Sequence, residues 1–117
     1  MKLSLKGEEV AAEYLKKKGY EIIAKNYRYN RAETDIICLG NGVLIFAEVK
    51  TRSSLSFGLP EESIARSKIK QLVKSAEGFI SENPVYENYE KRFDVIAINA
   101  KGNEIKINHI ENAFTSD

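Results

Sequence analysis

The sequence predicts an α/β fold, a mixed sheet of about five strands covered by helices. Three observations lead to this prediction. A tight turn at residues 40–42 separates two apolar runs, which is typical of a β-hairpin. Apolar residues occupy both faces of this hairpin, so helices are expected to cover both sides of the sheet. A helical pattern then separates the third strand from the fourth, and such a crossover favours a parallel pair.

The composition is that of one globular domain spanning residues 1–117. Its contents of 43% hydrophobic and 30% charged residues are ordinary for such a domain. The net charge is only +1, yet Lys and Arg are in excess over residues 1–74 and Asp and Glu over residues 75–117. A basic N-terminal part suits a polyanion such as nucleic acid. An ordinary solvated surface explains the same distribution.

The single cysteine and the N-terminal residues indicate a cytoplasmic protein. Cys38 has no second cysteine for an internal disulfide, and its apolar neighbours predict a buried structural thiol. The chain turns acidic at Glu8 and Glu9, where a signal peptide needs an apolar stretch. No apolar run approaches the length of a membrane span, so no membrane partner is expected.

The first helix is predicted over residues 5–18, with Ser4 as N-cap and Gly19 as terminator. From spacing alone, Glu8 beside the apolar stripe is most simply an acid that stabilises the helix dipole. A strand over residues 20–26 follows. The next segment, residues 27–31, alternates tyrosines with basic or polar residues. It is either a nucleic-acid contact or an edge strand whose tyrosines cover the core.

The hairpin, with strands over residues 34–39 and 43–51, places acidic side chains together. Asn41-Gly42 are typical of a type I′ turn, which makes Gly40 face Val43. The same register puts Asp35 directly opposite Glu48. It also puts residue 33, a glutamate, opposite the lysine at position 50. All four side chains are then expected on one face of the hairpin.

Two facing carboxylates repel each other unless a cation, a shared proton or a nearby basic group offsets their charge. Mg²⁺ or Mn²⁺ fits best, because these ions prefer oxygen ligands. We expect the ion to be held by Asp35, Glu48, the carbonyl of Val49 and waters. Lys50, two residues beyond Glu48, would position or deprotonate an attacking water. The constellation predicts hydrolysis of phosphodiester bonds.

The rest of the chain completes the sheet. Residues 53–60 form a loop expected near the acidic cluster, and Pro60 opens a second helix that ends at Asn83-Pro84. Residues 85–91 connect it to strands over residues 93–99 and 104–110. His109 is interpreted as structural, since the sequence shows no partner for it. Basic residues on the second helix are most simply its solvated face, although a phosphate backbone could bind there. The candidate nucleic-acid contacts are Arg31, Glu33, Arg52, Lys68 and Gln71.

Two resemblances extend this interpretation. Asp35, followed by Glu48-Val49-Lys50, resembles the PD-(D/E)xK motif of restriction-endonuclease-like nucleases, whose αβββαβ core has the predicted element order. With Glu8 added, the set is similar to the four-residue site of archaeal Holliday-junction resolvases, where a helix acid joins the metal site. This resemblance implies that Glu8 is a fourth metal and catalytic residue.

Nearly the whole chain also resembles the YraN-like family of small bacterial proteins, which is predicted to be nuclease-like. The matching segments are 7–11, 33–37, 46–52 and 111–114. One departure is Ala32, where that family usually has glycine. If this glycine adopts a conformation that only glycine tolerates, alanine there would alter the approach to the site.

We therefore expect a Mg²⁺- or Mn²⁺-dependent endonuclease acting on DNA, for example branched or damaged DNA in repair or recombination. A nucleic-acid-binding module that keeps the fold without cutting is the alternative. A structural or regulatory adaptor is a third interpretation. The domain size is compatible with a homodimer, since cutters of branched DNA often need two sites.

Overall fold

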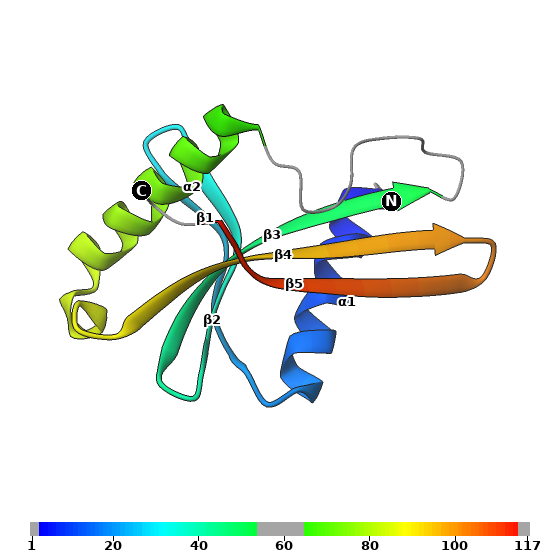
Figure 1. Ribbon diagram of the computed structural model, residues 1–117, viewed down its shortest axis with the longest axis horizontal. Helices are drawn as coiled ribbons and strands as arrows, with labels where there is room; N and C mark the ends of the chain where they lie inside the picture. Colours follow the sequence, from blue (N-terminus) through cyan, green and yellow to red (C-terminus); the bar gives the residue numbers. More distant parts are fainter. Residues whose placement is uncertain (1–2, 54–64, 115–117) are drawn as a thin grey trace.

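The computed structural model describes residues 3–53 and 65–114 of the chain (Figure 1). Its elements, in chain order, are α1 (Leu3–Lys17), β1 (Glu21–Tyr29), β2 (Ala32–Gly40), β3 (Val43–Ser53), α2 (Arg66–Glu82), the 3₁₀ turn η1 (Pro84–Tyr86), β4 (Glu90–Lys101) and β5 (Glu104–Phe114).

The strands form one mixed sheet in the order β1-β2-β3-β4-β5. Neighbouring strands run antiparallel except for β3 and β4, which are parallel and are connected through α2. This arrangement confirms the predicted crossover and the α/β fold with a mixed sheet. In the described part of the chain, its outer strands are β1 and β5.

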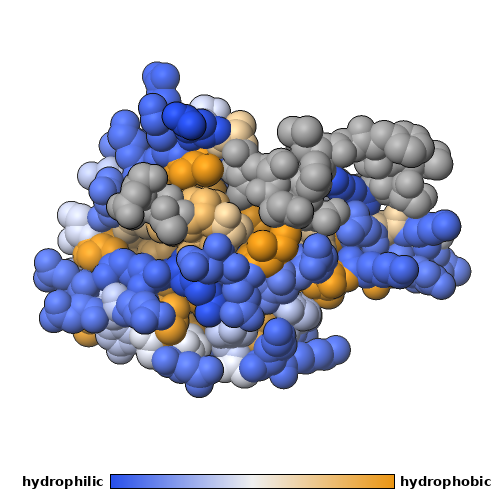
Figure 2. All heavy atoms as spheres, viewed as in Figure 1, coloured by the Kyte–Doolittle hydropathy of each residue, from blue (hydrophilic) through white to orange (hydrophobic). Residues whose placement is uncertain are grey.

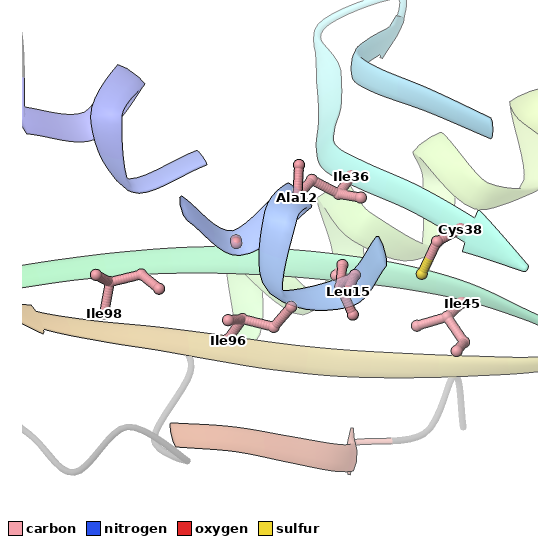
Figure 3. Packing of buried hydrophobic residues seen from close by; sticks show 9 residues of the cluster. Ala12, Leu15, Ile36, Cys38, Ile45, Ile96 and Ile98 are labelled. Atoms are coloured by element: carbon pink, nitrogen blue, oxygen red, sulfur yellow. The ribbon is translucent and has the colours of Figure 1, made fainter. Parts of the chain in front are cut away.

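Each face of the sheet packs against one helix. On one face α1 packs against apolar residues of β2, β3 and β4, which are shown as sticks in Figure 3. On the other face Leu72, Ala76 and Phe79 of α2 pack against Ile37 and Phe46. Burial on both faces is the physical reason why the central strands read as nearly continuous apolar runs. The expectation that helices cover both sides is therefore confirmed.

The β2–β3 turn has the expected geometry. Asn41 has a φ of 53° and Gly42 a φ of 77°, as a type I′ turn requires. Gly40 faces Val43, and the same register continues from this pair to Ile36 and Ala47. A second glycine expected from the sequence follows the C-terminal end of α1. Gly19 has a φ of 95°, which confirms it as the helix terminator.

The first strand is longer than predicted and includes the tyrosine-rich segment. Tyr27 makes an edge-to-face contact with Phe79 of α2, with ring centroids 5.2 Å apart. The ring of Tyr29 lies so close to Gly78 that an added Cβ would be 2.1 Å from it. The edge-strand interpretation of residues 27–31 is therefore confirmed for these two tyrosines, because they cover the apolar side of α2.

The C-terminal strands are also longer than predicted. β4 begins at Glu90, where a loop was expected, and β5 continues to Phe114. The ring of Phe114 stacks on Phe93 at a centroid distance of 5.0 Å, and this contact explains the continuation of β5. The loop expected over residues 53–60 and the helix start expected at Pro60 fall almost entirely outside the described residues.

A buried ion-pair network joins β4, β5 and α1. Asp94 is fully buried and accepts hydrogen bonds from the Nε and Nη2 of Arg92, both at 2.9 Å. It also accepts from the backbone N–H of Asn112 at 2.9 Å and from His109 Nε2 at 2.7 Å. The other ring nitrogen of His109 lies 3.0 Å from the hydroxyl of Tyr14. His109 thus has the partners that the sequence did not reveal, and its structural role is supported.

Burial raises the pKa of Asp94, but hydrogen bonds from His109, Arg92 and Asn112 outweigh this effect and lower the pKa below its ordinary value. Cys38 lies in the core against α1, and burial, with the charge of Asp94, raises the pKa of its thiol to about 12. The thiol is therefore protonated and structural at neutral pH, as predicted.

Between α2 and the start of β4, the surface carries hydrophobic residues within a hydrophilic surround (Figure 2). A cavity of about 560 Å³ opens there, and its apolar lining is Val73, Ala76, Ile80 and Phe93.

Among the described residues, no helix is long and apolar enough to cross a membrane.

Candidate active site

The site lies at an interruption of the β1–β2 pairing, called the kink below. Asn26 of β1 and Asp35 of β2 lie at the same level, between the facing pairs Lys25–Ile36 and Tyr27–Thr34. Asn26 has a φ of 53°, a left-handed conformation that asparagine tolerates better than most residues. The β2–β3 ladder ends next to this level, at Ile36 and Ala47. Beyond the kink, β2 stays with β1 beside α2 while β3 continues with β4 (Figure 1).

The kink reverses which helix the β2 side chains face. Ile36 packs in the core beneath α1. Thr34, two residues earlier, instead lies 2.6 Å from Ser75 of α2, oxygen to oxygen. In a regular strand both side chains would lie on the same face. Asp35 therefore sits where β2 changes faces and parts from β3.

The carboxylate of Asp35 spans the gap between the two strands. Its Oδ2 accepts a hydrogen bond from the backbone N–H of Val49 at 2.8 Å. With the ladder ended at Ile36, this N–H needs a partner other than the β2 backbone. The turn register predicted that Asp35 pairs directly with Glu48. For the backbone this prediction is wrong, because the β2–β3 ladder ends one pair earlier, at Ile36 and Ala47. The two carboxyl groups nevertheless come into contact.

Glu48 is a buried acid in an unfavourable environment. It is only 8% exposed, on the face of β3 that also carries Phe46 against α2. Burial, together with the hydrogen-bonding contact and the negative charge of Asp35, raises the pKa of Glu48 from 4.5 to about 8. Lys68 opposes this shift. At neutral pH the Asp35–Glu48 pair thus holds a proton in the metal-free protein.

A lysine of α2 reaches this pair. The Nζ of Lys68 lies 3.4 Å from the Oε2 of Glu48, and the lysine side chain is 35% exposed. Lys68 was expected to contact nucleic acid from a basic helix face. Its observed contact is with the acidic pair itself.

Glu8 approaches the pair from α1. An added Cβ at Gly7 would lie 2.1 Å from Oγ1 of Thr51, so the helix passes very close to β3 at this point. Burial and the charge of Asp35 raise the pKa of Glu8, while a hydrogen bond from the side chain of Asn26 lowers it. The kink residue Asn26 therefore also helps to position Glu8.

Lys50 and Arg52 follow Glu48 at alternate positions of β3, and their side chains are therefore on its face. Glu33 was predicted to face Lys50, and this is wrong. It faces Arg28 of β1, and the carboxylate forms an ion pair with that guanidinium at 2.8 Å. The cause is again the kink, since the residues of β2 before Asp35 pair only with β1.

The remaining candidate residues lie at the surface. Arg31 is exposed in the β1–β2 turn, and Gln71 is exposed one helical turn after Lys68. Ala32 is buried at the start of β2, and it is not among the described residues with positive φ. Alanine is therefore accommodated there without strain.

Comparison with protein families shows which family this chain belongs to. The model of an uncharacterised protein family, UPF0102, matches residues 7–98, which include every acid of the site. The chain belongs to the UPF0102 family. It is 47% identical over 112 residues to a UPF0102 protein of Christiangramia forsetii, covering 96% of this chain and 92% of the relative. It is 44% identical over 112 residues to one of Syntrophomonas wolfei, covering 96% of both chains.

The donor atoms of this UPF0102 protein fit a hard divalent cation. Glu8 Oε1 and Glu48 Oε1 are buried oxygens without a hydrogen-bond partner. Such oxygens cost free energy unless something binds them. In the described ranges, however, no three His, Cys, Asp or Glu side chains are gathered closely enough to hold one ion together. Mg²⁺ is commonly held by one or two carboxylates together with waters, so the adjacent acids Asp35 and Glu48 are its nearest candidate ligands.

Several contributors to the site were not predicted from the sequence. Asn26 had no assigned role, although an asparagine within a strand pattern is a weak signal for a left-handed residue. Val49 was proposed for its carbonyl, whereas the structure engages its N–H. The contact of Lys68 with Glu48 joins residues 20 positions apart on different elements, and no spacing rule predicts it.

Replacing Asp35 by asparagine is expected to raise the stability of the metal-free UPF0102 protein. The asparagine side chain keeps an oxygen that can accept the Val49 N–H, and it removes the charge that faces Glu48. We expect a gain of about 1–2 kcal/mol in the free energy of unfolding, measured by thermal denaturation with a chelator. Glu13→Gln, which alters an exposed ion pair with Lys16 on α1, is expected to change stability by less than about 1 kcal/mol. An Asp35→Asn variant no more stable than the wild type would contradict the repulsion.

Proposed function

We propose that this protein is a Mg²⁺-dependent endonuclease that hydrolyses phosphodiester bonds in DNA. The observation that carries the proposal is the set of acids at the kink. Burial, and secondly Asp35, raises the pKa of both Glu8 and Glu48, and these two residues each have a buried oxygen without a hydrogen-bond partner. A fold has no structural need for such repulsion, and strained acids of this kind are typical of functional sites.

Asp35, Glu48, the carbonyl of Val49 and Glu8 would hold the ion. When bound, Mg²⁺ supplies positive charge to the phosphate and lowers the pKa of a coordinated water. Mn²⁺ is the expected substitute, since it accepts the same oxygen ligands.

The protein's own groups would then orient the reactants. The Val49 N–H fixes the direction of the Asp35 carboxylate, as its 2.8 Å hydrogen bond indicates. Lys50, on the face of Glu48, would orient the attacking water and stabilise negative charge on the phosphate. Basic and polar groups around the site would bind the nucleic-acid backbone, and the candidates are Arg31, Arg52, Lys68 and Gln71.

Two likenesses support the proposal. The residues Asp35, Glu48, Val49 and Lys50 resemble the PD-(D/E)xK motif. The element order α1-β1-β2-β3-α2-β4 is the order of the restriction-endonuclease-like core. A role in repair or recombination, on branched or damaged DNA, is the biological context that these likenesses favour.

A cleavage assay tests the proposal. Purified protein is incubated with Mg²⁺ or Mn²⁺ and a panel of linear, nicked, flapped and four-way DNA substrates. We expect metal-dependent cleavage of at least one substrate, and a loss of at least about 100-fold in Glu48→Gln and in Lys50→Ala. Lys101→Ala, an exposed lysine at the end of β4, serves as the control and should cleave normally.

The alternative is a nucleic-acid-binding module that does not cut. It predicts binding without cleavage on every substrate, in the wild type as in the Glu48→Gln variant. Cleavage that persists unchanged in Glu48→Gln would assign the activity to another site or to a contaminant, and would refute the proposal.

A further inference from the structure

The ion pair between Lys68 and Glu48 places a positive charge beside the proposed metal site. The Lys68 ammonium lies 3.4 Å from Oε2 of a carboxylate whose side chain is 11% exposed. The other oxygen of this carboxylate is buried and has no hydrogen-bond partner. Lys68 is therefore a cation that offsets part of the charge of the acidic pair in the metal-free protein.

Lys68 is well placed to leave this position. It lies in the first turn of α2, where its backbone N–H donates to the carbonyl of Ala65 at 2.9 Å. Its side chain is one-third exposed, and a four-carbon stem can swing into solvent without moving the helix. The carboxylate, by contrast, is confined within the sheet. Competition for Glu48 would therefore be resolved by movement of the lysine.

We propose that Lys68 is a built-in substitute for the divalent cation, which holds Glu48 in the metal-free protein and is displaced from it when the metal binds. This inference rests on the proposed metal-dependent function. The displaced ammonium remains on the first turn of α2, at the edge of the site, where it binds a phosphate of the nucleic acid. Lys68 is thus a positioning residue that couples metal binding to substrate binding.

Metal affinity measures this competition directly. Mn²⁺ is titrated into the wild type, Lys68→Met and Lys70→Met by calorimetry, with all three proteins in the same buffer. Lys70 is an exposed lysine two residues further along α2, and it points to a different side of the helix. We expect Lys68→Met to bind Mn²⁺ about 10-fold more tightly than the wild type. Lys70→Met should match the wild type.

Binding of duplex DNA in Ca²⁺, measured by fluorescence anisotropy, tests the second role. Loss of one phosphate contact should weaken binding by Lys68→Met about 3- to 10-fold and should reduce its salt dependence. Lys70→Met should lose less affinity than Lys68→Met.

The two proposals fail in different ways. If Glu48→Gln abolishes Mn²⁺ binding but Lys68→Met binds the ion no more tightly than the wild type, the metal site stands and the role of Lys68 is refuted. Equal losses of DNA affinity in the two lysine variants would refute the phosphate contact. If the wild type binds no Mn²⁺, both the proposed function and this inference are overturned.

Discussion

The metal-free protein is expected to lose stability steadily as the pH rises from about 5 to about 8. The pKa of Glu48 is 4.5 in the unfolded chain and about 8 in the folded protein, chiefly because the carboxyl is buried and secondly because Asp35 is adjacent. Folding therefore takes up a proton between these values, and raising the pH opposes it. The greatest slope for one group is about 1.4 kcal/mol per pH unit.

The two other carboxyl groups with shifted pKa values do not reverse this trend. The raised pKa of Glu8 acts in the same direction. The lowered pKa of Asp94 has the opposite effect, but the stability that it contributes is lost only as the pH falls below about 4, where the carboxyl becomes protonated. Of these three acids, Glu48 therefore contributes most between pH 5 and pH 8.

Urea denaturation at several pH values, with a chelator present, measures the effect. Glu48→Gln should remove most of the slope and should be more stable than the wild type at pH 8 by on the order of 3 kcal/mol. Glu77→Gln, an exposed acid on α2, should retain the wild-type slope. A wild-type stability that rises or stays level across this window would show that Glu48 is ionised in the folded protein, contrary to the burial argument.

Asp94→Asn is expected to cost about 3–5 kcal/mol of stability. The substitution replaces a fully buried carboxylate that accepts four hydrogen bonds, two of them from Arg92. The asparagine amide would direct an N–H₂ group at one of these donors. The Arg92 guanidinium would also lose its main counter-charge while remaining mostly buried. Urea denaturation at pH 7 measures the loss.

Glu111→Gln is the matched control, since it alters the other ion pair of the same guanidinium. Glu111 lies 3.2 Å from Arg92 Nη1, but its side chain is 52% exposed. Solvent screens this pair, so the expected cost is below about 1 kcal/mol. If both substitutions cost the same, the Asp94 network would not be the link between β4, β5 and α1 that its burial indicates.

Much of the sheet was predictable because its determinants are local. The turn chemistry of Asn41-Gly42 established the hairpin and its register, and this register is observed down to Ile36 and Ala47. Extrapolating it further failed at Glu33, because the β2–β3 ladder ends at Ile36 and Ala47, next to the left-handed Asn26 of β1. A register deduced from one turn holds only while the strands remain paired.

By itself the sequence determined the α/β class, the two-sided cover of the sheet, the tight turn and the end of the first helix. Each depends on residue periodicity or on the backbone preferences of glycine and asparagine, which act over a few positions. Tertiary structure alone decided the raised pKa of Glu48, the approach of Lys68 and the Asp94 network. Each depends on side chains that are distant in the sequence, which exclude water from a charged group or place a second charge beside it. The residue spacing along one strand encodes neither effect.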